Sequence, residues 1–170
     1  YGYHSFSRKK FKLETGHDPI RIANAEDDQL SKKWDDLRCS MVDSMVVDIF
    51  EIVKYKSDIV LSAAVKPDHK KAREKYFQNW PKWLNKRLLN FVVVMNYSSD
   101  RKEFRRITKV IKHSDIANRV WMGIGTYNQN PIETDKQVNI SIKNDFHNFV
   151  LFSYQSILDK ELFIKKFERD

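Results

Sequence analysis

Four short hydrophobic runs recur along the chain at a nearly constant interval. They cover residues 59–65, 90–97, 119–125 and 149–154, and their first residues are 31, 29 and 30 positions apart. Each run is almost continuously apolar rather than alternating, which is typical of a strand buried on both faces of a parallel sheet. The pattern therefore predicts four parallel strands.

The segments between these runs carry apolar residues at helical spacing. Residues 28–55 predict a long helix, because apolar side chains fall three or four positions apart at Leu30, Trp34, Leu37, Met41, Met45, Ile49 and Ile52. Residues 70–88 also have helical spacing, with Pro81 marking a break or a fresh start. The tryptophans of these two segments, Trp34, Trp80 and Trp83, are expected to pack the helices against the sheet.

Three further helices are expected in the second half of the chain. Asp100 is a candidate N-cap for a helix over 101–113, whose inward face would carry Phe104, Ile107, Val110 and Ile111. The pattern is weaker between 128 and 142, where Asn130-Pro131 predicts a loop and residues 135–144 a short helix. Asp159 is a candidate N-cap for a terminal helix.

Strands and helices that alternate every 30 residues or so are typical of βα units, and a (β/α)₈ barrel averages about 31 residues per unit. The alternative is a doubly wound sheet, which would place a glycine-rich phosphate turn after its first strand. In this chain the close glycine pair, Gly123 and Gly125, lies inside a strand and no third glycine follows. We therefore expect an α/β fold in which residues 1–170 are the C-terminal part of one TIM barrel. They would supply strands five to eight and the end of strand four, with residues 1–7 as the loop that leaves strand four.

Composition narrows the classes of protein. The chain has 170 residues, 41% of them hydrophobic and 32% charged, and a formal net charge of +8. This mix is typical of a globular domain, and no apolar run approaches the roughly 18 residues of a membrane helix. A single cysteine, Cys39, excludes internal disulfides and cysteine-based metal clusters. The five histidines lack metal-ligand spacing, so no metal or other cofactor is expected.

Four blocks of sequence resemble a known family. They are residues 11–19, Trp34 with Leu37-Arg38, residues 78–84 and residues 89–97. In this order they resemble the C-terminal half of the bacterial glycosyl-hydrolase-like barrel domain found in envelope lipoproteins. The chain departs from the family where Asn79 and Asn90 replace aspartate, and where Val94 replaces proline.

The resemblance implies a glycoside hydrolase-like domain that hydrolyses or binds a cell-envelope polysaccharide, such as the glycan of peptidoglycan or a related glucan. It also implies a protein of the cell envelope, periplasmic or extracellular, with a lipid anchor in some members. Family members carry an Asp-Tyr-x-Arg-Tyr element at the end of strand four, whose last residue would match Tyr1. The main catalytic carboxylate would then precede Tyr1, and the 170 residues themselves supply no assignable catalytic pair. The three departures leave open a catalytically inactive barrel that serves as a structural or binding subunit.

Active sites of such barrels lie at the carboxyl ends of the strands. The substrate-binding residues expected there are Tyr3, His4, Asn96, Tyr97, Asp100, Tyr127 and Tyr154. Aromatic rings suit the C–H faces of sugars, and amides and hydroxyls suit the sugar hydroxyls. Asp68 and Asp100 are the carboxylates at the predicted strand ends, and each has an alternative role as a helix N-cap.

Positive charge is concentrated in two segments. Residues 66–87 hold eight basic residues against two acidic ones, and residues 101–113 hold six against one. The second group would form the solvated outer face of a helix. It could also dock an anionic envelope component or a protein partner through Arg101, Arg105, Arg106 and Lys109. Charge alone would also fit nucleic acid, but no nucleic-acid-binding motif accompanies it.

Overall fold

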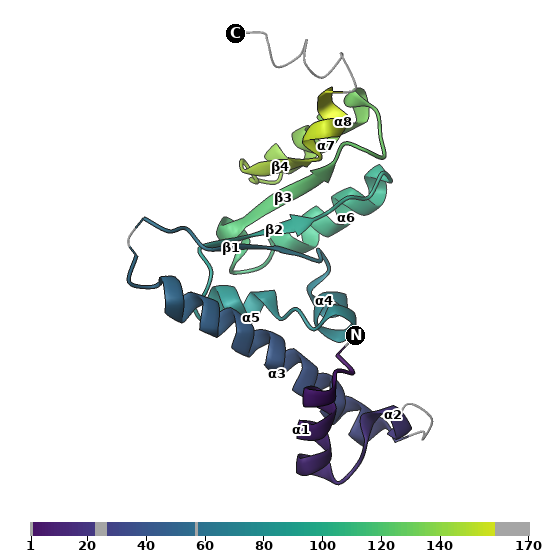
Figure 1. Cartoon of the computed structure of the whole chain (residues 1–170). Helices are drawn as coiled ribbons and strands as arrows, with labels where there is room; N and C mark the ends of the chain where they lie inside the picture. Colours follow the sequence, from purple (N-terminus) through teal and green to yellow (C-terminus); the bar gives the residue numbers. More distant parts are fainter. Residues whose placement is uncertain (1, 23–26, 57, 159–170) are drawn as a thin grey trace.

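A computed structural model describes residues 2–22, 27–56 and 58–158 (Figure 1). The described elements alternate between helices and short strands after an all-helical N-terminal part. In chain order they are α1 (Ser5–Thr15), α2 (Pro19–Ile22), α3 (Asp28–Val53), β1 (Ser62–Val65), α4 (His69–Tyr76), α5 (Trp80–Asn85), β2 (Phe91–Met95), α6 (Arg101–Lys112), a 3₁₀ turn (Ala117–Arg119), β3 (Val120–Gly125), α7 (Pro131–Ile142), β4 (Phe149–Phe152) and α8 (Tyr154–Leu158).

The four strands form one parallel sheet in the order β1-β2-β3-β4. Each predicted hydrophobic run contains one of these strands, so the predicted strands are confirmed. A parallel sheet with helices between its strands is an α/β fold, and it is consistent with part of a (β/α) barrel.

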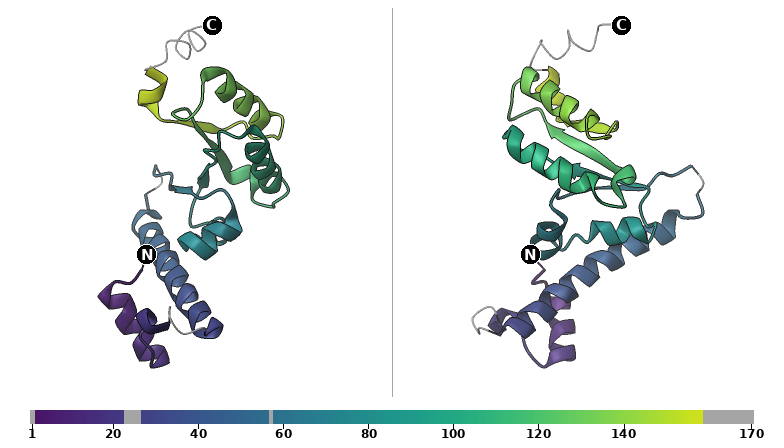
Figure 2. Two further views of the ribbon diagram at one scale, coloured as in Figure 1. Left: turned by 90° about the vertical axis from the view of Figure 1, so that its right-hand side faces the viewer. Right: turned by 180° about the vertical axis from the view of Figure 1, so that it is seen from behind.

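Helices cover one face of the sheet. The strand residues on this face are fully buried: Val65, Val92, Val94, Met122 and Ile124. They pack in two clusters with α5, α6 and α7, through Trp80, Trp83, Ile107, Ile111, Phe104 and Ile140. Figure 2 shows α6 and α7 together on this side of the sheet.

The opposite face of the sheet has no covering helix among the described residues. Phe91 of β2 stacks on Trp121 of β3, with ring centroids 4.0 Å apart, and both rings are half-buried. Val150 and Phe152 of β4 are exposed on the same face. The continuous hydrophobic runs predict burial on both faces, whereas among the described residues the side chains are fully buried on the helix-covered face and partly exposed on the other.

The long helix α3 connects the N-terminal helices to the sheet. Its first half packs against α1 and α2 through Trp34 and Leu37, so Trp34 packs helix on helix rather than against the sheet. Its second half reaches the core at Val46 and accepts hydrogen bonds at Asp43 from Lys82 and from the indole of Trp83. Among the described residues, no helix combines the length and apolar character that a membrane crossing requires.

Three further local expectations were wrong. Helix α1 begins at Ser5 because His4 acts as its N-cap, so residues 5–7 are helical and not loop. Helix α7 begins at Pro131, because the side chain of Asn130 accepts a hydrogen bond from Glu133 N and proline suits a first helical position. Val110 of α6 is 48% exposed and does not face inward. The predictions that involve Tyr1 and Asp159 lie outside the described residues.

Candidate functional site

The carboxyl ends of the four strands meet along one side of the sheet, because all four strands are parallel. The residues that follow them are Lys66 after β1, Asn96 and Tyr97 after β2, Thr126 and Tyr127 after β3, and Ser153 and Tyr154 after β4. Side chains from different βα units can therefore meet there, which is where barrel enzymes place their sites.

Three aromatic rings meet at this side and form what we call the aromatic cluster: Tyr97, Tyr127 and Phe152. The rings of Tyr97 and Phe152 are stacked, with centroids 5.4 Å apart and an angle of 10° between planes. Tyr127 stands edge-on to both rings, 6.1 Å from each. Tyr127 is 52% exposed and Phe152 is 50% exposed, so the cluster offers ring surface to solvent.

Two glycines of β3 make room for the ring of Tyr97. A methyl group on Gly123 would lie 2.7 Å from the carbonyl oxygen of Val94 and 3.2 Å from Cε1 of Tyr97. A methyl group on Gly125 would lie 3.3 Å from Cβ of Tyr97 and 3.0 Å from Oδ1 of Asn128. The missing side chains therefore let Tyr97 pack closely on β3.

Asn128 fixes the backbone of Tyr97 from the neighbouring loop, since its Nδ2 donates to Tyr97 O at 2.7 Å. Burial, followed by the charge of Tyr127, raises the pKa of the Tyr97 phenol. Tyr97 therefore stays protonated at neutral pH and can both donate and accept a hydrogen bond.

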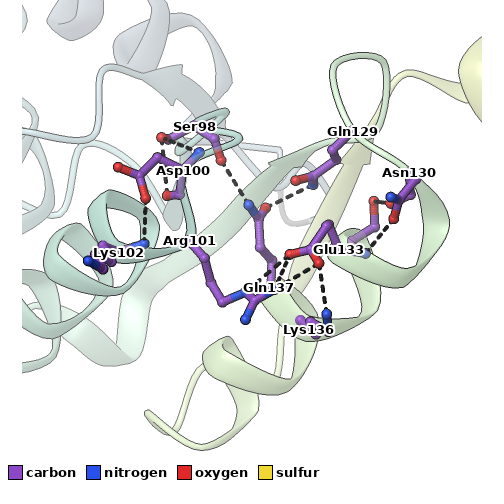
Figure 3. A network of polar contacts seen from close by, with 10 residues as sticks. Ser98, Asp100, Arg101, Lys102, Gln129, Asn130, Glu133, Lys136 and Gln137 are labelled. Carbon is purple, nitrogen blue, oxygen red and sulfur yellow. Dashed lines mark hydrogen bonds and ion pairs between the residues drawn. The ribbon is translucent and has the colours of Figure 1, made fainter.

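A buried amide ties the loop after β2 to the loop after β3 (Figure 3). Gln137 of α7 is 1% exposed, and its Nε2 donates to Ser98 O at 2.8 Å. Its Oε1 accepts from Gln129 Nε2 at 3.0 Å, and the same Gln129 nitrogen donates to Gly125 O at 2.7 Å. This chain of hydrogen bonds holds the two loops that carry Tyr97 and Tyr127 in one arrangement.

Glu133 joins α6 to α7 beside this amide network (Figure 3). Arg101 Nη2 donates to Glu133 Oε2 at 2.5 Å, and Lys136 Nζ lies 2.8 Å from Glu133 Oε1. The hydrogen bonds from Arg101, and then from Lys136, lower the pKa of the Glu133 carboxyl. Glu133 therefore acts as an ionised link between two helices.

The lowered pKa of Glu133 predicts a pH-dependent contribution to stability. A carboxyl whose pKa is lower in the folded state stabilises fully above its unfolded pKa, near 4.3, and loses this effect as pH falls through the folded pKa. We expect urea unfolding to show a smaller loss of stability on acidification from about pH 6 to pH 3 in Glu133→Gln than in the parent. Arg101→Gln should show the same smaller loss, and an unchanged acid dependence in both variants would contradict the role of the pair.

Hydroxyl groups hold the end of β4 against β3. Thr126 N donates to Phe152 O at 2.7 Å, which continues the sheet pairing by one residue. The hydroxyls of Thr126 and Ser156 lie 2.5 Å apart, and Ser156 also donates to Ser153 O at 2.7 Å. These contacts set the position of Phe152 relative to Tyr127.

The end of β1 is held by the sequence block at residues 78–84. Gln78 Oε1 accepts a hydrogen bond from Lys66 N at 2.9 Å, and the Trp80 indole donates to Lys66 O at 3.0 Å. Asp68 caps α4 by accepting from the backbone N–H groups of Lys70 and Lys71. The hydrogen bond from Lys71 contributes most to lowering the pKa of the Asp68 carboxyl.

Of the predicted binding residues, Tyr97 and Tyr127 meet in the aromatic cluster. Asn96 is buried, and its Nδ2 donates to Phe104 O of α6, so it serves the fold and not a surface site. Asp100 caps α6 by accepting from Lys102 N at 2.8 Å. Tyr154 begins α8 and is 73% exposed.

Tyr3 and His4 lie in a different place, beside α3. The Tyr3 ring contacts Trp34 at 5.3 Å and the guanidinium of Arg38 at 5.5 Å. His4 Nδ1 accepts from Phe6 N, and His4 lines an apolar cavity of about 450 Å³ between α1, α3 and α4. The structure therefore divides the predicted site into two groups.

Sequence reasoning missed Phe152 and Gln137. Phe152 is the last residue of β4 and pairs with Gly125, so strand register would have placed it on the open face beside Tyr97. Gln137 lies on the buried side of α7 with Thr134, Ile140 and Ser141, at helical spacing. The signal available in the sequence was a polar residue, Gln137, at a position of the helix that faces inward.

The carboxyl groups with a shifted pKa are held in the ionised form by their hydrogen-bond partners. A general acid needs a raised pKa, and a pair of carboxyl groups normally flanks the scissile glycosidic bond. Among the described residues, each carboxyl whose pKa is shifted has it lowered: Asp18, Asp68, Glu103, Glu133 and Asp145.

The basic outer face of α6 is partly neutralised. Arg101 pairs with Glu133, Arg106 with Glu103, and Lys112 with Asp145. The positive charge of α6 that no acidic partner offsets is thus smaller than the number of its basic residues indicates. Docking of an anionic partner through Arg105 and Lys109 stays a prediction.

One solved structure shows the fold to which the chain is similar. The glycoside hydrolase domain of PgaB (BpsB) from Bordetella bronchiseptica matches it with a TM-score of 0.73 and 13% sequence identity. The match covers 92% of this chain and 49% of that chain, so the chain spans about half of that domain's length. No family model matches the chain, and no curated protein matches it in sequence. The comparison shows a glycoside-hydrolase-like fold.

Proposed function

We propose that the chain is the C-terminal half of a glycoside hydrolase-like (β/α)₈ barrel, with β1 to β4 as strands five to eight, and that it binds a polysaccharide. The observation that carries the proposal is the aromatic cluster, which presents Tyr127 and Phe152 to solvent at the carboxyl ends of the strands. The similarity to part of a glycoside hydrolase domain supports the barrel.

The geometry of the cluster suits a sugar ring. Pyranose C–H groups pack on aromatic faces, and the cluster offers ring faces and edges at about 90° to one another. Asn128 and the Tyr97 phenol lie at the same place and can satisfy sugar hydroxyls. The substrate we propose is a neutral or weakly charged glycan of the cell envelope, such as peptidoglycan strands or a related glucan, which the family resemblance supports. A location in the cell envelope is proposed on the same ground.

A non-catalytic binding subunit is the second candidate, and the carboxyl groups favour it. Asp68 and Asp100 are used as helix caps, and Glu133 is held by two cations. Hydrolysis would need a carboxyl pair that includes at least one group from the rest of the barrel. Binding by the aromatic cluster is common to both candidates.

Substitution of the exposed rings tests the binding role. We expect Tyr127→Ala and Phe152→Ala each to weaken binding to glycan oligomers by about fivefold, because each removes a stacking surface worth roughly 1 kcal/mol. Isothermal titration with cellohexaose and chitohexaose, together with a pull-down on peptidoglycan sacculi, would measure the effect.

Tyr55→Ala is the matched control, because Tyr55 is 84% exposed and lies between α3 and β1, away from the carboxyl ends of the strands. The affinity of Tyr55→Ala should stay within about twofold of the parent, and all three variants should keep the parent's circular dichroism spectrum. Equal losses in Tyr55→Ala and Tyr127→Ala, or no glycan binding by the parent, would sink the proposal.

A further inference from the structure

Helix α1 has one buried face and one exposed apolar face. Ser7 and Phe11 are 2% and 1% exposed, and the ring of Phe11 packs edge-on against Trp34 of α3. Phe6 and Leu13 lie about two turns apart, so they share a different face of the helix. They are 65% and 79% exposed. This face therefore turns two large apolar side chains to solvent.

Lysine side chains flank this apolar pair. Lys9 and Lys10 follow Phe6 at helical positions i+3 and i+4, which places them beside Phe6 and Leu13 on the same face. Both lysines are exposed. Within the part of the chain that the structure describes, no acidic group lies within ion-pair distance of either one. We call Phe6, Lys9, Lys10 and Leu13 the outer face of α1.

The acidic groups of α1 and α2 do not neutralise this charge. Residues 5–22 hold five basic side chains against two acidic ones. One of the two acids, Asp18, pairs with Arg8 at 2.6 Å, and that hydrogen bond is the main cause of the lowered pKa of the Asp18 carboxyl. Glu14 is the other acid. The two N-terminal helices therefore carry an excess of positive charge.

The position of α1 leaves its outer face accessible. Helices α1 and α2 lie at the end of α3 that is away from the sheet, and the views in Figures 1 and 2 agree on this. On α2, Ile20 and Arg21 are exposed as well, which adds one apolar and one cationic side chain at the same end of the molecule. A partner can therefore contact this end without covering the sheet.

We propose that the outer face of α1 docks the protein on a bilayer that contains acidic lipids, with Phe6 and Leu13 inserted at the boundary between headgroups and acyl chains. Lys9 and Lys10 then lie at the lipid phosphates, because their methylene stems follow the apolar surface while the ammonium groups stay among the headgroups. Helices with large apolar side chains on one face and lysines beside them bind membrane surfaces in this orientation.

The combination of side chains is what selects a lipid surface. A polyanion without an apolar phase, such as nucleic acid, would engage the two lysines but leave Phe6 and Leu13 in water. An apolar protein surface would cover the two apolar side chains but would leave the lysines without anionic partners. A bilayer with acidic headgroups satisfies both. The inference is independent of the proposed glycan site, because α1 contributes no residue to the aromatic cluster.

Binding to vesicles tests the proposal. We expect the purified chain to co-sediment with vesicles of equal parts phosphatidylglycerol and phosphatidylcholine, and to bind pure phosphatidylcholine at least about tenfold more weakly. Replacement of both lysines, Lys9→Gln with Lys10→Gln, should weaken binding to the acidic vesicles by about twentyfold, since each lysine near such a surface contributes about fivefold. Leu13→Ser should weaken it by about fivefold, because an inserted apolar side chain is lost.

Lys102→Gln with Lys109→Gln is the matched control, because it removes the same charge from exposed positions of another helix, α6. Its affinity for the acidic vesicles should stay within about twofold of the parent, since charges away from the contact are screened by salt. All variants should keep the parent's circular dichroism spectrum, because every substituted side chain is exposed.

Three results would overturn the proposal. The first is a parent chain that does not bind the acidic vesicles. The second is an equal loss of affinity in the two lysine pairs, which would mean that net charge and not the outer face of α1 governs binding. The third is full binding by Leu13→Ser, which would mean that the lysines serve an anionic partner without an apolar phase.

Discussion

Trp80→Ala is expected to destabilise the protein by about 4 kcal/mol, because Trp80 is the largest of the fully buried side chains. It is 1% exposed and packs in the main core cluster beneath β1 and β2. Truncation would leave a cavity where the indole stands and would remove the donor to Lys66 O. The loss would lower the midpoint of thermal unfolding by roughly 10 °C in a domain of this size.

Trp80→Phe separates the loss of packing from the loss of the indole hydrogen bond. It can still be measured if the alanine variant does not fold. It keeps most of the ring but leaves Lys66 O without the indole donor, and we expect it to cost about 1 to 2 kcal/mol. Urea unfolding followed by circular dichroism would measure both variants. A cost below 1 kcal/mol for Trp80→Ala would show that α5 does not hold the end of β1.

Gln137→Leu is expected to cost about 2 kcal/mol and to weaken glycan binding as well. Leucine has a similar size but cannot donate to Ser98 O, which would leave a polar group without its partner. The loops after β2 and β3 would lose their shared link, and Tyr97 would no longer be held against Tyr127. Denaturant unfolding and glycan titration would measure the two effects.

Asn139→Leu is the matched control for this substitution. It makes a comparable amide-to-leucine change two residues further along α7, at an exposed position whose side chain contacts the backbone of its own helix. Its cost should stay below about 0.5 kcal/mol. Similar costs for both variants would mean that the buried network adds nothing beyond helix propensity.

The strands could be predicted because parallel strands leave a strong signature in a single sequence. Continuous apolar runs at constant spacing indicate βα units, and each run contains a strand of the sheet. The first residues of the helices were harder to predict than the strands. Asn130-Pro131 has the chemistry of an N-cap followed by a first-turn proline, yet the same dipeptide is also common in loops. Only the hydrogen bond from Glu133 N distinguishes the two.

The site was predicted only in part, for a physical reason. Strand ends locate Tyr97 and Tyr127, because parallel topology brings successive strand ends together. The direction of a side chain depends on register and packing, which is why buried Asn96 and exposed Phe152 were not distinguished. Tyr3 and His4 precede two helices whose packing on α3 no local pattern reveals.

The order of the strands has a consequence for how the chain folds. Each strand pairs with the one synthesised just before it, and the paired residues are 29, 28 and 27 positions apart. The loop closed at each step is of similar length, so every new βα unit can add to an edge that is already formed. The sheet can thus grow on the ribosome from β1 towards β4, in the direction of translation. The growing edge, and not a completed core, is then the surface that a chaperone would have to shield during synthesis.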